Sequence, residues 1–285
     1  MQNDDTKLKN NFIKKLENIV GKNNSLLCVG LDADTNKIPK KFKDQFEFNK
    51  NIIDKTYDLV CSYKLNTAFY EAIGYKGILS LKKTCDYLRK FFPEIPIIID
   101  AKRADIGNTN WGYVKFIFEY LKADAVTVNP YLGEEALAPF LVQKDKGIIV
   151  LCKTSNIGAI EFQDLKIIKP SFGDCPKMAK LYQFIAEQVS KKWNKNKNCL
   201  LVVGANYPKE LKEVRKIVGD DFWILVPGIG VQGGDLAATL EAGLNSKKKG
   251  LIINISRSII FSENPQQETK KWRKAIEQQG LLISI

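Results

Sequence analysis

The segment PIIIDAKRADIGNT, residues 96–109, places acidic and basic side chains at the end of an apolar run. The run leads directly into Asp100 and Lys102, and Asp105 follows shortly after. Because alternate residues of a strand share a face, Asp100 and Lys102 are predicted to project together. An ammonium group held between carboxylates on a rigid strand end can hold and deliver a proton. The alternative is a structural ion pair at a strand terminus.

A second lysine, Lys64, interrupts the apolar segment that precedes Asn66. A lysine buried between Val60 and Leu65 needs a carboxylate partner, unless its ammonium group reaches solvent at the edge of the sheet. We therefore predict that Lys64 faces Asp100 in a network of alternating charges. Polar residues end other apolar runs and are further candidates: Asp32, Asp34, Asn66, Lys153, Thr154 and Ser155.

A glycine-rich stretch, PGIGVQGGD at residues 227–235, precedes a predicted helix, and Arg257 follows the last apolar run. Glycines let backbone amides approach a phosphate group, and arginine adds a bidentate charged contact. In α/β barrels, phosphate sites are commonly built from the loops after the seventh and eighth strands. The pattern therefore favours a phosphorylated substrate over a plain tight turn.

Short apolar runs alternate with amphipathic stretches along the chain, as in buried parallel strands that are separated by helices. Eight such units predict one (β/α)8 TIM barrel domain over residues 1–285, with an N-terminal helical extension over about 1–25. A doubly wound open sheet is the alternative, because strand count does not prove closure. The predicted strands lie within 26–34, 59–66, 96–102, 125–130, 147–155, 199–206, 222–230 and 250–258. Helical spacing marks 12–20, 113–121, 178–189, 209–218, 235–242 and 266–278, with Asp235 as a capping residue.

The segment 156–176 shows no sustained period and carries glycines and prolines. A connection of this length without secondary structure is uncommon and often acts as a lid or a binding loop. Because it follows the fifth predicted strand, we expect it on the face of the barrel that carries the site.

The composition removes several classes of chemistry. The 285 residues include no histidine, so catalysis must depend on Lys, Asp, Arg and polar side chains. The six cysteines form no C-x-x-C pair and are interpreted as reduced, mostly buried thiols. The net charge of +12 comes mainly from dispersed lysines, so no nucleic-acid partner is expected. No apolar run is long enough to span a bilayer and the first residues are polar, so we expect a cytoplasmic protein without a membrane partner.

Together, the motifs GLDAD, SYKLN, DAKRADIGNT and PGIGVQGGD and the Arg257 loop resemble the orotidine 5'-phosphate decarboxylase family. The resemblance covers about residues 26–261. It implies that orotidine 5'-monophosphate is converted to UMP and carbon dioxide, the last step of pyrimidine nucleotide synthesis, without metal or organic cofactor. It also implies a homodimer in which Asp105 and Thr109 reach the neighbouring subunit's site. The implied catalytic residues are Lys64, Asp100, Lys102 (the proton donor) and Asp105. The implied substrate contacts are Asp32, Asn66, Ile106, Thr109, Thr154, Ser155, Pro227, Gly230, Gln232 and Arg257.

Two other interpretations remain open at this point. One is a metal-dependent sugar-phosphate decarboxylase or aldolase, in which Asp100 and Asp105 surround a magnesium ion. The other is an inactive barrel that serves as a basic binding or scaffolding protein. The intact set of charged residues at the predicted strand ends argues against the second.

Overall fold

A computed structural model describes residues 11–168, 178–230 and 233–278 of the chain. Eight parallel strands close into a barrel, because β1 pairs with β2 on one side and with β10 on the other. The predicted barrel is therefore confirmed and the open sheet is wrong. The barrel strands are β1 (Leu27–Gly30), β2 (Ser62–Asn66), β3 (Ile97–Arg103), β4 (Ala125–Val128), β5 (Gly147–Lys153), β8 (Cys199–Val203), β9 (Ile224–Pro227) and β10 (Leu251–Ile255).

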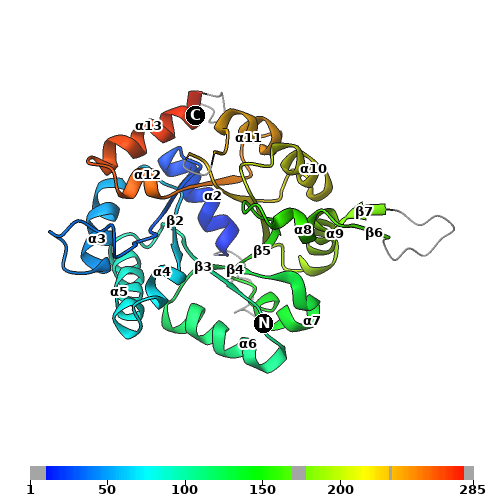
Figure 1. The fold of residues 1–285 in the computed structure, drawn as a ribbon, viewed down its shortest axis with the longest axis horizontal. Coiled ribbons are helices and arrows are strands. Elements are labelled where there is room, and N and C mark those ends of the chain that lie inside the picture. The colour runs from blue at the N-terminus through cyan, green and yellow to red at the C-terminus, as the bar shows by residue number, and fades with distance from the viewer. Residues whose placement is uncertain (1–10, 169–177, 231–232, 279–285) are drawn as a thin grey trace, which may run out of the picture.

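A ring of helices surrounds these strands (Figure 1). Both faces of the strands are buried, which explains why their sequences are almost continuously apolar. The described helices and helical turns are α2 (Phe12–Asn23), α3 (Gln45–Thr56), α4 (Ala68–Glu71), α5 (Tyr75–Phe91), α6 (Gly107–Val114), η1 (Lys115–Tyr120), η2 (Pro130–Leu132), α7 (Gly133–Leu141), α8 (Ala159–Gln163), α9 (Leu181–Gln188), η3 (Val189–Trp193), α10 (Pro208–Val218), α11 (Leu236–Gly243), α12 (Arg257–Ile260) and α13 (Pro265–Gln278).

Most of the helices expected from spacing are present. α2, α10, α11 and α13 lie within a few residues of the predicted bounds, and Asp235 caps α11 by accepting from the amides of Ala237 and Ala238. The pattern at 113–121 falls on the end of α6 and on the π-helical turn η1. Three helices of nine or more residues, α3, α5 and α7, were not singled out by the sequence patterns.

The segment after β5 differs from the expectation of a structureless loop. Within its described part lie the helix α8 and the strand β6 (Lys166–Ile168), which pairs with β7 (Met178–Lys180) in an antiparallel hairpin. The predicted helix at 178–189 therefore begins later, at Leu181, because Met178 belongs to β7. The role of this segment as a lid stays a prediction, and residues 169–177 lie outside the described part.

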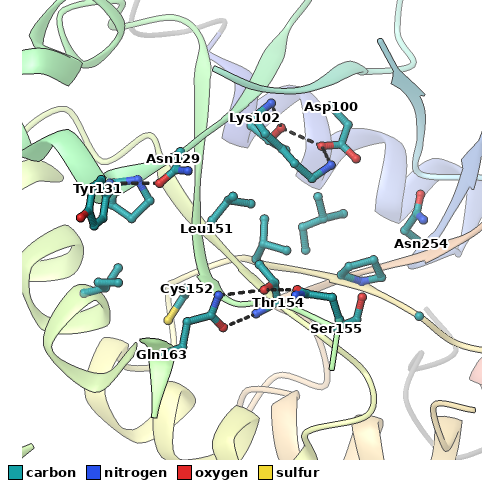
Figure 2. Close-up of a pocket in the computed structure, with 18 of the residues that line it drawn as sticks. Asp100, Lys102, Asn129, Tyr131, Leu151, Cys152, Thr154, Ser155, Gln163 and Asn254 are labelled. Carbon is teal, nitrogen blue, oxygen red and sulfur yellow. Dashed lines mark hydrogen bonds and ion pairs between the residues drawn. The ribbon is translucent and has the colours of Figure 1, made fainter. Parts of the chain in front are cut away.

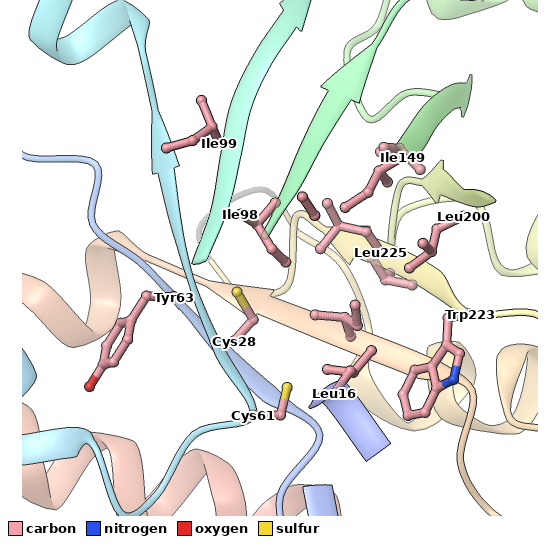
Figure 3. Packing of buried hydrophobic residues seen from close by; sticks show 14 of the residues in the cluster. Leu16, Cys28, Cys61, Tyr63, Ile98, Ile99, Ile149, Leu200, Trp223 and Leu225 are labelled. Atoms are coloured by element: carbon pink, nitrogen blue, oxygen red, sulfur yellow. The ribbon is translucent and has the colours of Figure 1, made fainter. Parts of the chain in front are cut away.

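Helix α2 covers the N-terminal end of the barrel (Figure 1). Phe12, Leu16, Ile19 and Val20 are buried in the core, and an added Cβ at Gly147, which begins β5, would lie 2.5 Å from the Phe12 ring. Figure 3 shows part of this core, with Leu16 of α2 among strand side chains. The opposite, carboxyl end of the strands is therefore the open one.

Two further findings bear on the composition. The five cysteines within the described residues, which exclude Cys175, are free and buried, as expected. In the same part of the chain, no helix combines the length and the apolar character that crossing a membrane requires.

Candidate active site

A cavity of about 930 Å³ opens at the carboxyl ends of the barrel strands. Polar residues that follow the strands line it, as expected for a barrel in which loops at this end carry the site. Nine of the residues singled out from the sequence are among them: Asp32, Lys64, Asn66, Asp100, Lys102, Thr154, Ser155, Pro227 and Arg257.

Asp100 lies at the centre of a network of charges, and Figure 2 shows its side chain beside that of Lys102. The Nζ atom of Lys102 lies 2.7 Å from Oδ1 of Asp100, and the Nζ atom of Lys64 lies 3.1 Å from Oδ2. Lys64 also lies 3.6 Å from Oδ1 of Asp32. The order Asp32, Lys64, Asp100, Lys102 alternates negative and positive charges from β1 to β3.

Burial differs along this network. The side chain of Lys64 is only 4% exposed and that of Asp100 is 12% exposed, whereas that of Lys102 is 48% exposed. Lys64 and Asp100 therefore form a fixed pair within the barrel, and Lys102 presents its ammonium group to the cavity.

The pKa values of the buried pair favour the charged forms. Burial alone raises the pKa of Asp100, but the charges of Lys64 and Lys102, with hydrogen bonds from Lys102 and Thr127, hold that pKa well below its usual value. Burial alone lowers the pKa of Lys64, but the charges of Asp100 and Asp32 outweigh it and raise the pKa. At neutral pH the pair is a carboxylate and an ammonium ion.

The backbone at Lys102 is unusual for a lysine in a strand. Its φ angle is +49°, in the left-handed region that costs non-glycine residues of order 1–3 kcal/mol. The pairing of β3 with β4 also shifts register between Ile99 and Arg103. The expected contact between Asp100 and Lys102 thus occurs through a bulge in the strand and not through simple alternation.

The end of β5 is organised by Gln163 of α8 (Figure 2). Oε1 of Gln163 accepts a hydrogen bond from the amide of Thr154 at 2.8 Å, and Nε2 donates to the Thr154 hydroxyl at 2.8 Å. That hydroxyl donates to Asn156 at 2.7 Å. Lys153 turns away from the cavity, because its fully buried ammonium group lies 3.0 Å from Asp164.

The glycine-rich turn forms a tight loop after β9. The amide of Gly234 donates to the carbonyl oxygen of Gly228 at 3.1 Å, and an added Cβ at Gly234 would lie 2.6 Å from Cβ of Ala205. Pro227 and Arg257 line the cavity, whereas Gly230 is exposed and does not. Gln232 lies outside the described residues. The first amides of α11 are taken by Asp235, which leaves the turn and Arg257 as the candidate anion site.

Asp105, Ile106 and Thr109 do not line the cavity of their own chain. Among the described ion pairs, none joins Asp105 to Lys64 or Lys102, and Oδ1 of Asp105 accepts from the amide of Ile106 at 2.7 Å. Ile106 is 67% exposed, and Thr109 is exposed as well. Asp105 is half-buried, so of these three residues Ile106 and Thr109 are the exposed ones, and all three lie outside the cavity of their own chain.

Sequence reasoning missed several polar residues of the cavity: Thr127, Asn129, Gln163 and Asn254. Thr127 and Asn129 end the run AVTVNP and Asn254 lies in the last run, so a search of every strand end would have found them. Gln163 gave no such signal, because the short helix that places it was not predicted. Within the described residues, no three Asp, Glu or Cys side chains cluster as metal ligands would.

Comparison with known proteins gives concordant results. Residues 25–272 match the model of the orotidine 5'-phosphate decarboxylase / HUMPS family. An orotidine 5'-phosphate decarboxylase of Cellvibrio japonicus is 46% identical over 259 residues, which cover 89% of this chain and 90% of that protein. One of Janthinobacterium is 44% identical over 88% of this chain and 90% of that protein. The solved structure of Leishmania donovani OMP decarboxylase superposes with a TM-score of 0.80 at 36% identity and covers 94% of this chain and 98% of that one.

Proposed function

The chain belongs to the orotidine 5'-phosphate decarboxylase family, whose named relatives are carboxy-lyases. We propose that its cavity decarboxylates orotidine 5'-monophosphate. The products are UMP and carbon dioxide. The observation that carries the proposal is the half-exposed side chain of Lys102, which lines the cavity and whose ammonium group lies 2.7 Å from Asp100.

Loss of carbon dioxide leaves negative charge on carbon 6 of the pyrimidine ring. A fixed ammonium group beside that carbon stabilises the developing charge without having to reorganise. We assign this role to Lys102, which then donates its proton to carbon 6. Asp100 holds Lys102 in place, and Lys64 compensates the second oxygen of Asp100.

The remaining substrate contacts are proposed from the membership of the family. Thr154 and Ser155 bind the pyrimidine, Asp32 and Asn66 bind the ribose or the pyrimidine, and the turn after β9 binds the phosphate together with Arg257. Binding energy from the remote phosphate group can order the site for the reaction at the ring. The proposed substrate contacts are Asp32, Asn66, Ile106, Thr109, Thr154, Ser155, Pro227, Gly230, Gln232 and Arg257.

We propose that the active unit is a homodimer. The exposure of Ile106 and Thr109 and the place of Asp105 outside the cavity of its own chain support this assignment, as do the exposed apolar residues Trp111 of α6 and Tyr131 and Leu132 of η2. In the dimer, Asp105 and Ile106 of each chain complete the other chain's cavity, with Asp105 near the departing carboxylate and Thr109 beside the nucleotide.

The hydrogen bonds that Asp100 accepts argue against the magnesium-dependent alternative. Both of its carboxylate oxygens accept from lysine ammonium groups, and Oδ1 also accepts from the Thr127 hydroxyl at 2.8 Å. A magnesium ion prefers carboxylate oxygens that are open to it. The proposed reaction therefore uses no magnesium ion bound to Asp100, and the family resemblance implies no organic cofactor.

The direct test is an absorbance assay. Orotidine 5'-monophosphate is added to the purified chain with EDTA present, and the ultraviolet absorbance of the orotate ring should fall as UMP forms. Absence of turnover by folded protein that UMP stabilises against heat would favour an inactive binding protein. Turnover that EDTA abolishes and magnesium restores would favour the metal-dependent alternative.

The homodimer has its own test, in which two inactive variants are mixed. In a mixed dimer of Lys102→Ala and Asp105→Ala chains, one site carries both substitutions and the other carries neither. Shared sites therefore predict that activity returns on mixing, toward about a quarter of the wild-type value if subunits exchange randomly. If Asp105 acted within its own chain, every site would keep one substitution and no activity would return.

A further inference from the structure

The hydroxyl group of Thr127, on β4, joins the backbone and the side chains of the charged network. Thr127 is 1% exposed, and its Oγ1 accepts a hydrogen bond from the backbone amide of Lys102 at 2.9 Å. The same hydroxyl donates to Oδ1 of Asp100 at 2.8 Å, the oxygen that the Lys102 ammonium group contacts at 2.7 Å. One oxygen atom thus touches both the residue that we propose as the proton donor and the carboxylate that holds it.

We propose that Thr127 is a positioning residue that sets the place of the Lys102 ammonium group. This inference rests on the proposed function, in which Lys102 protonates carbon 6. Thr127 takes no part in the chemistry itself, since it acts through Asp100 and the backbone of Lys102.

The register of the sheet shows why the hydroxyl is needed. Ile99 pairs with Val126 and Arg103 pairs with Val128, so the intervening residues 100–102 of β3 lie opposite Thr127 alone. A regular ladder would give the amide of Lys102 a backbone carbonyl as its acceptor. Here the threonine hydroxyl takes that place, and a side chain without an acceptor would leave the amide unpaired.

The conformation of Lys102 makes this hydrogen bond more than a local detail. With φ at +49°, Lys102 adopts a conformation that persists only when its surroundings enforce it. Its side chain is nearly half exposed, so the direction of the ammonium group depends on Asp100 and on the backbone. Thr127 fixes both, and its loss should let the ammonium group move relative to the substrate.

Variants of Thr127 separate the hydroxyl from the methyl group. In Thr127→Val the hydroxyl is replaced at nearly constant shape, whereas Thr127→Ser keeps the hydroxyl and loses the methyl group. We expect Thr127→Val to lower kcat by about tenfold to a hundredfold and to change KM by less than about threefold, because positioning is lost and not ground-state binding. Thr127→Ser should keep kcat within about threefold of the wild type while its Tm falls.

Thr84 of α5 offers a matched control. It is fully buried, and its hydroxyl likewise accepts one hydrogen bond, from Asn49 at 3.1 Å, and donates another, to the carbonyl oxygen of Ser80 at 2.8 Å. It does not line the cavity. Thr84→Val should therefore lower Tm and leave kcat unchanged. If Thr127→Val failed to fold, Thr127→Ala compared with Thr127→Ser would isolate the hydroxyl group.

Amide hydrogen exchange gives a readout that does not depend on turnover. The amide of Lys102 should exchange faster in Thr127→Val than in the wild type or in Thr127→Ser. The inference is overturned if Thr127→Val keeps both kcat and the wild-type exchange rate, or if Thr127→Ser loses as much kcat as Thr127→Val. If the wild type showed no decarboxylation, the proposed function would fail, while the exchange rates would still decide whether Thr127 fixes Lys102.

Discussion

The two ends of the barrel each hold an aspartate between two cations, and the carboxyl end opens into the cavity described above. At the carboxyl end, Asp100 contacts Lys64 at 3.1 Å and Lys102 at 2.7 Å. At the N-terminal end, Asp124 contacts Lys15 at 2.9 Å and Arg89 at 3.2 Å. The pairs of charges alone do not distinguish the two ends.

What differs is where the cations come from and what covers them. Lys15 belongs to helix α2 and Arg89 to helix α5, so their ion pairs with Asp124 connect these helices to the barrel. Asp124 also accepts a hydrogen bond from the backbone amide of Ile97, at the start of β3. Lys64 and Lys102 belong to the barrel strands and line the cavity. We therefore interpret a charged network as a functional site when one of its cations lines a cavity. We interpret it as a structural site when its cations lie on helices that pack against the barrel.

The largest expected effect is the loss of turnover in Lys102→Ala. Removal of the proposed proton donor and of its charge should lower kcat by at least about a thousandfold, because general acid catalysis and electrostatic stabilisation are lost together. UMP should still raise the Tm of the variant, since the proposed phosphate and ribose contacts remain. Near-wild-type turnover would contradict the assignment of Lys102.

The next largest effect is expected for Asp100→Asn, which should lower both turnover and stability. We expect kcat to fall by at least about a hundredfold and the free energy of unfolding to fall by about 3 kcal/mol at pH 7, because Lys64 loses its main partner. The pKa of Asp100 is lower in the folded state than in the unfolded chain, where it is about 3.9. The Asp100 carboxylate therefore stabilises the fold at pH values above about 3.9, and this stabilisation is lost as the pH falls below that value.

Denaturant unfolding at several pH values tests whether the stabilisation by Asp100 decreases as the pH falls. The difference in unfolding free energy between the wild type and Asp100→Asn should be full near neutral pH and narrow below about pH 4. In the wild type, the raised pKa of Lys64 keeps that lysine charged throughout this acidic range. A difference that widened at acidic pH would refute the account of the network.

Asp124→Asn is the matched substitution at the other end of the barrel. It removes a carboxylate that contacts Lys15, Arg89 and the amide of Ile97, so we expect a loss of about 2 kcal/mol in the free energy of unfolding. Because this end carries no part of the proposed site, kcat should stay within about twofold of the wild type. A large loss of kcat in a folded variant would contradict the conclusion that the network around Asp124 is only structural.

The smallest effect is expected at Gly21, within α2. An added Cβ there meets no atom within 4 Å, and alanine favours a helix over glycine by about 0.5–1 kcal/mol. Gly21→Ala should therefore raise the free energy of unfolding by about that amount and leave kcat and KM unchanged. A change in either kinetic constant would mean that α2 affects the site as well as the fold.

Local patterns were enough to predict the barrel strands, because strands buried on both faces leave an apolar signature in the sequence. They also placed Lys64 and Asp100 together, since the ends of neighbouring parallel strands meet. They did not predict α8 or the β6–β7 hairpin, whose segment has no clear period. The residues that depend on this insertion, Gln163 above all, were missed for the same reason.

The sequence by itself determined which chemical groups this protein has and at which strand ends they stand: two lysines and their aspartates, a glycine-rich turn, an arginine and no histidine. Only the tertiary structure decided that β1 pairs with β10, that β3 bulges at Lys102, and that the hydroxyl of Thr127 accepts a hydrogen bond from the Lys102 amide. These features arise from hydrogen bonds between residues on different strands, and their geometry follows from closure of the barrel. Local residue patterns do not encode that closure.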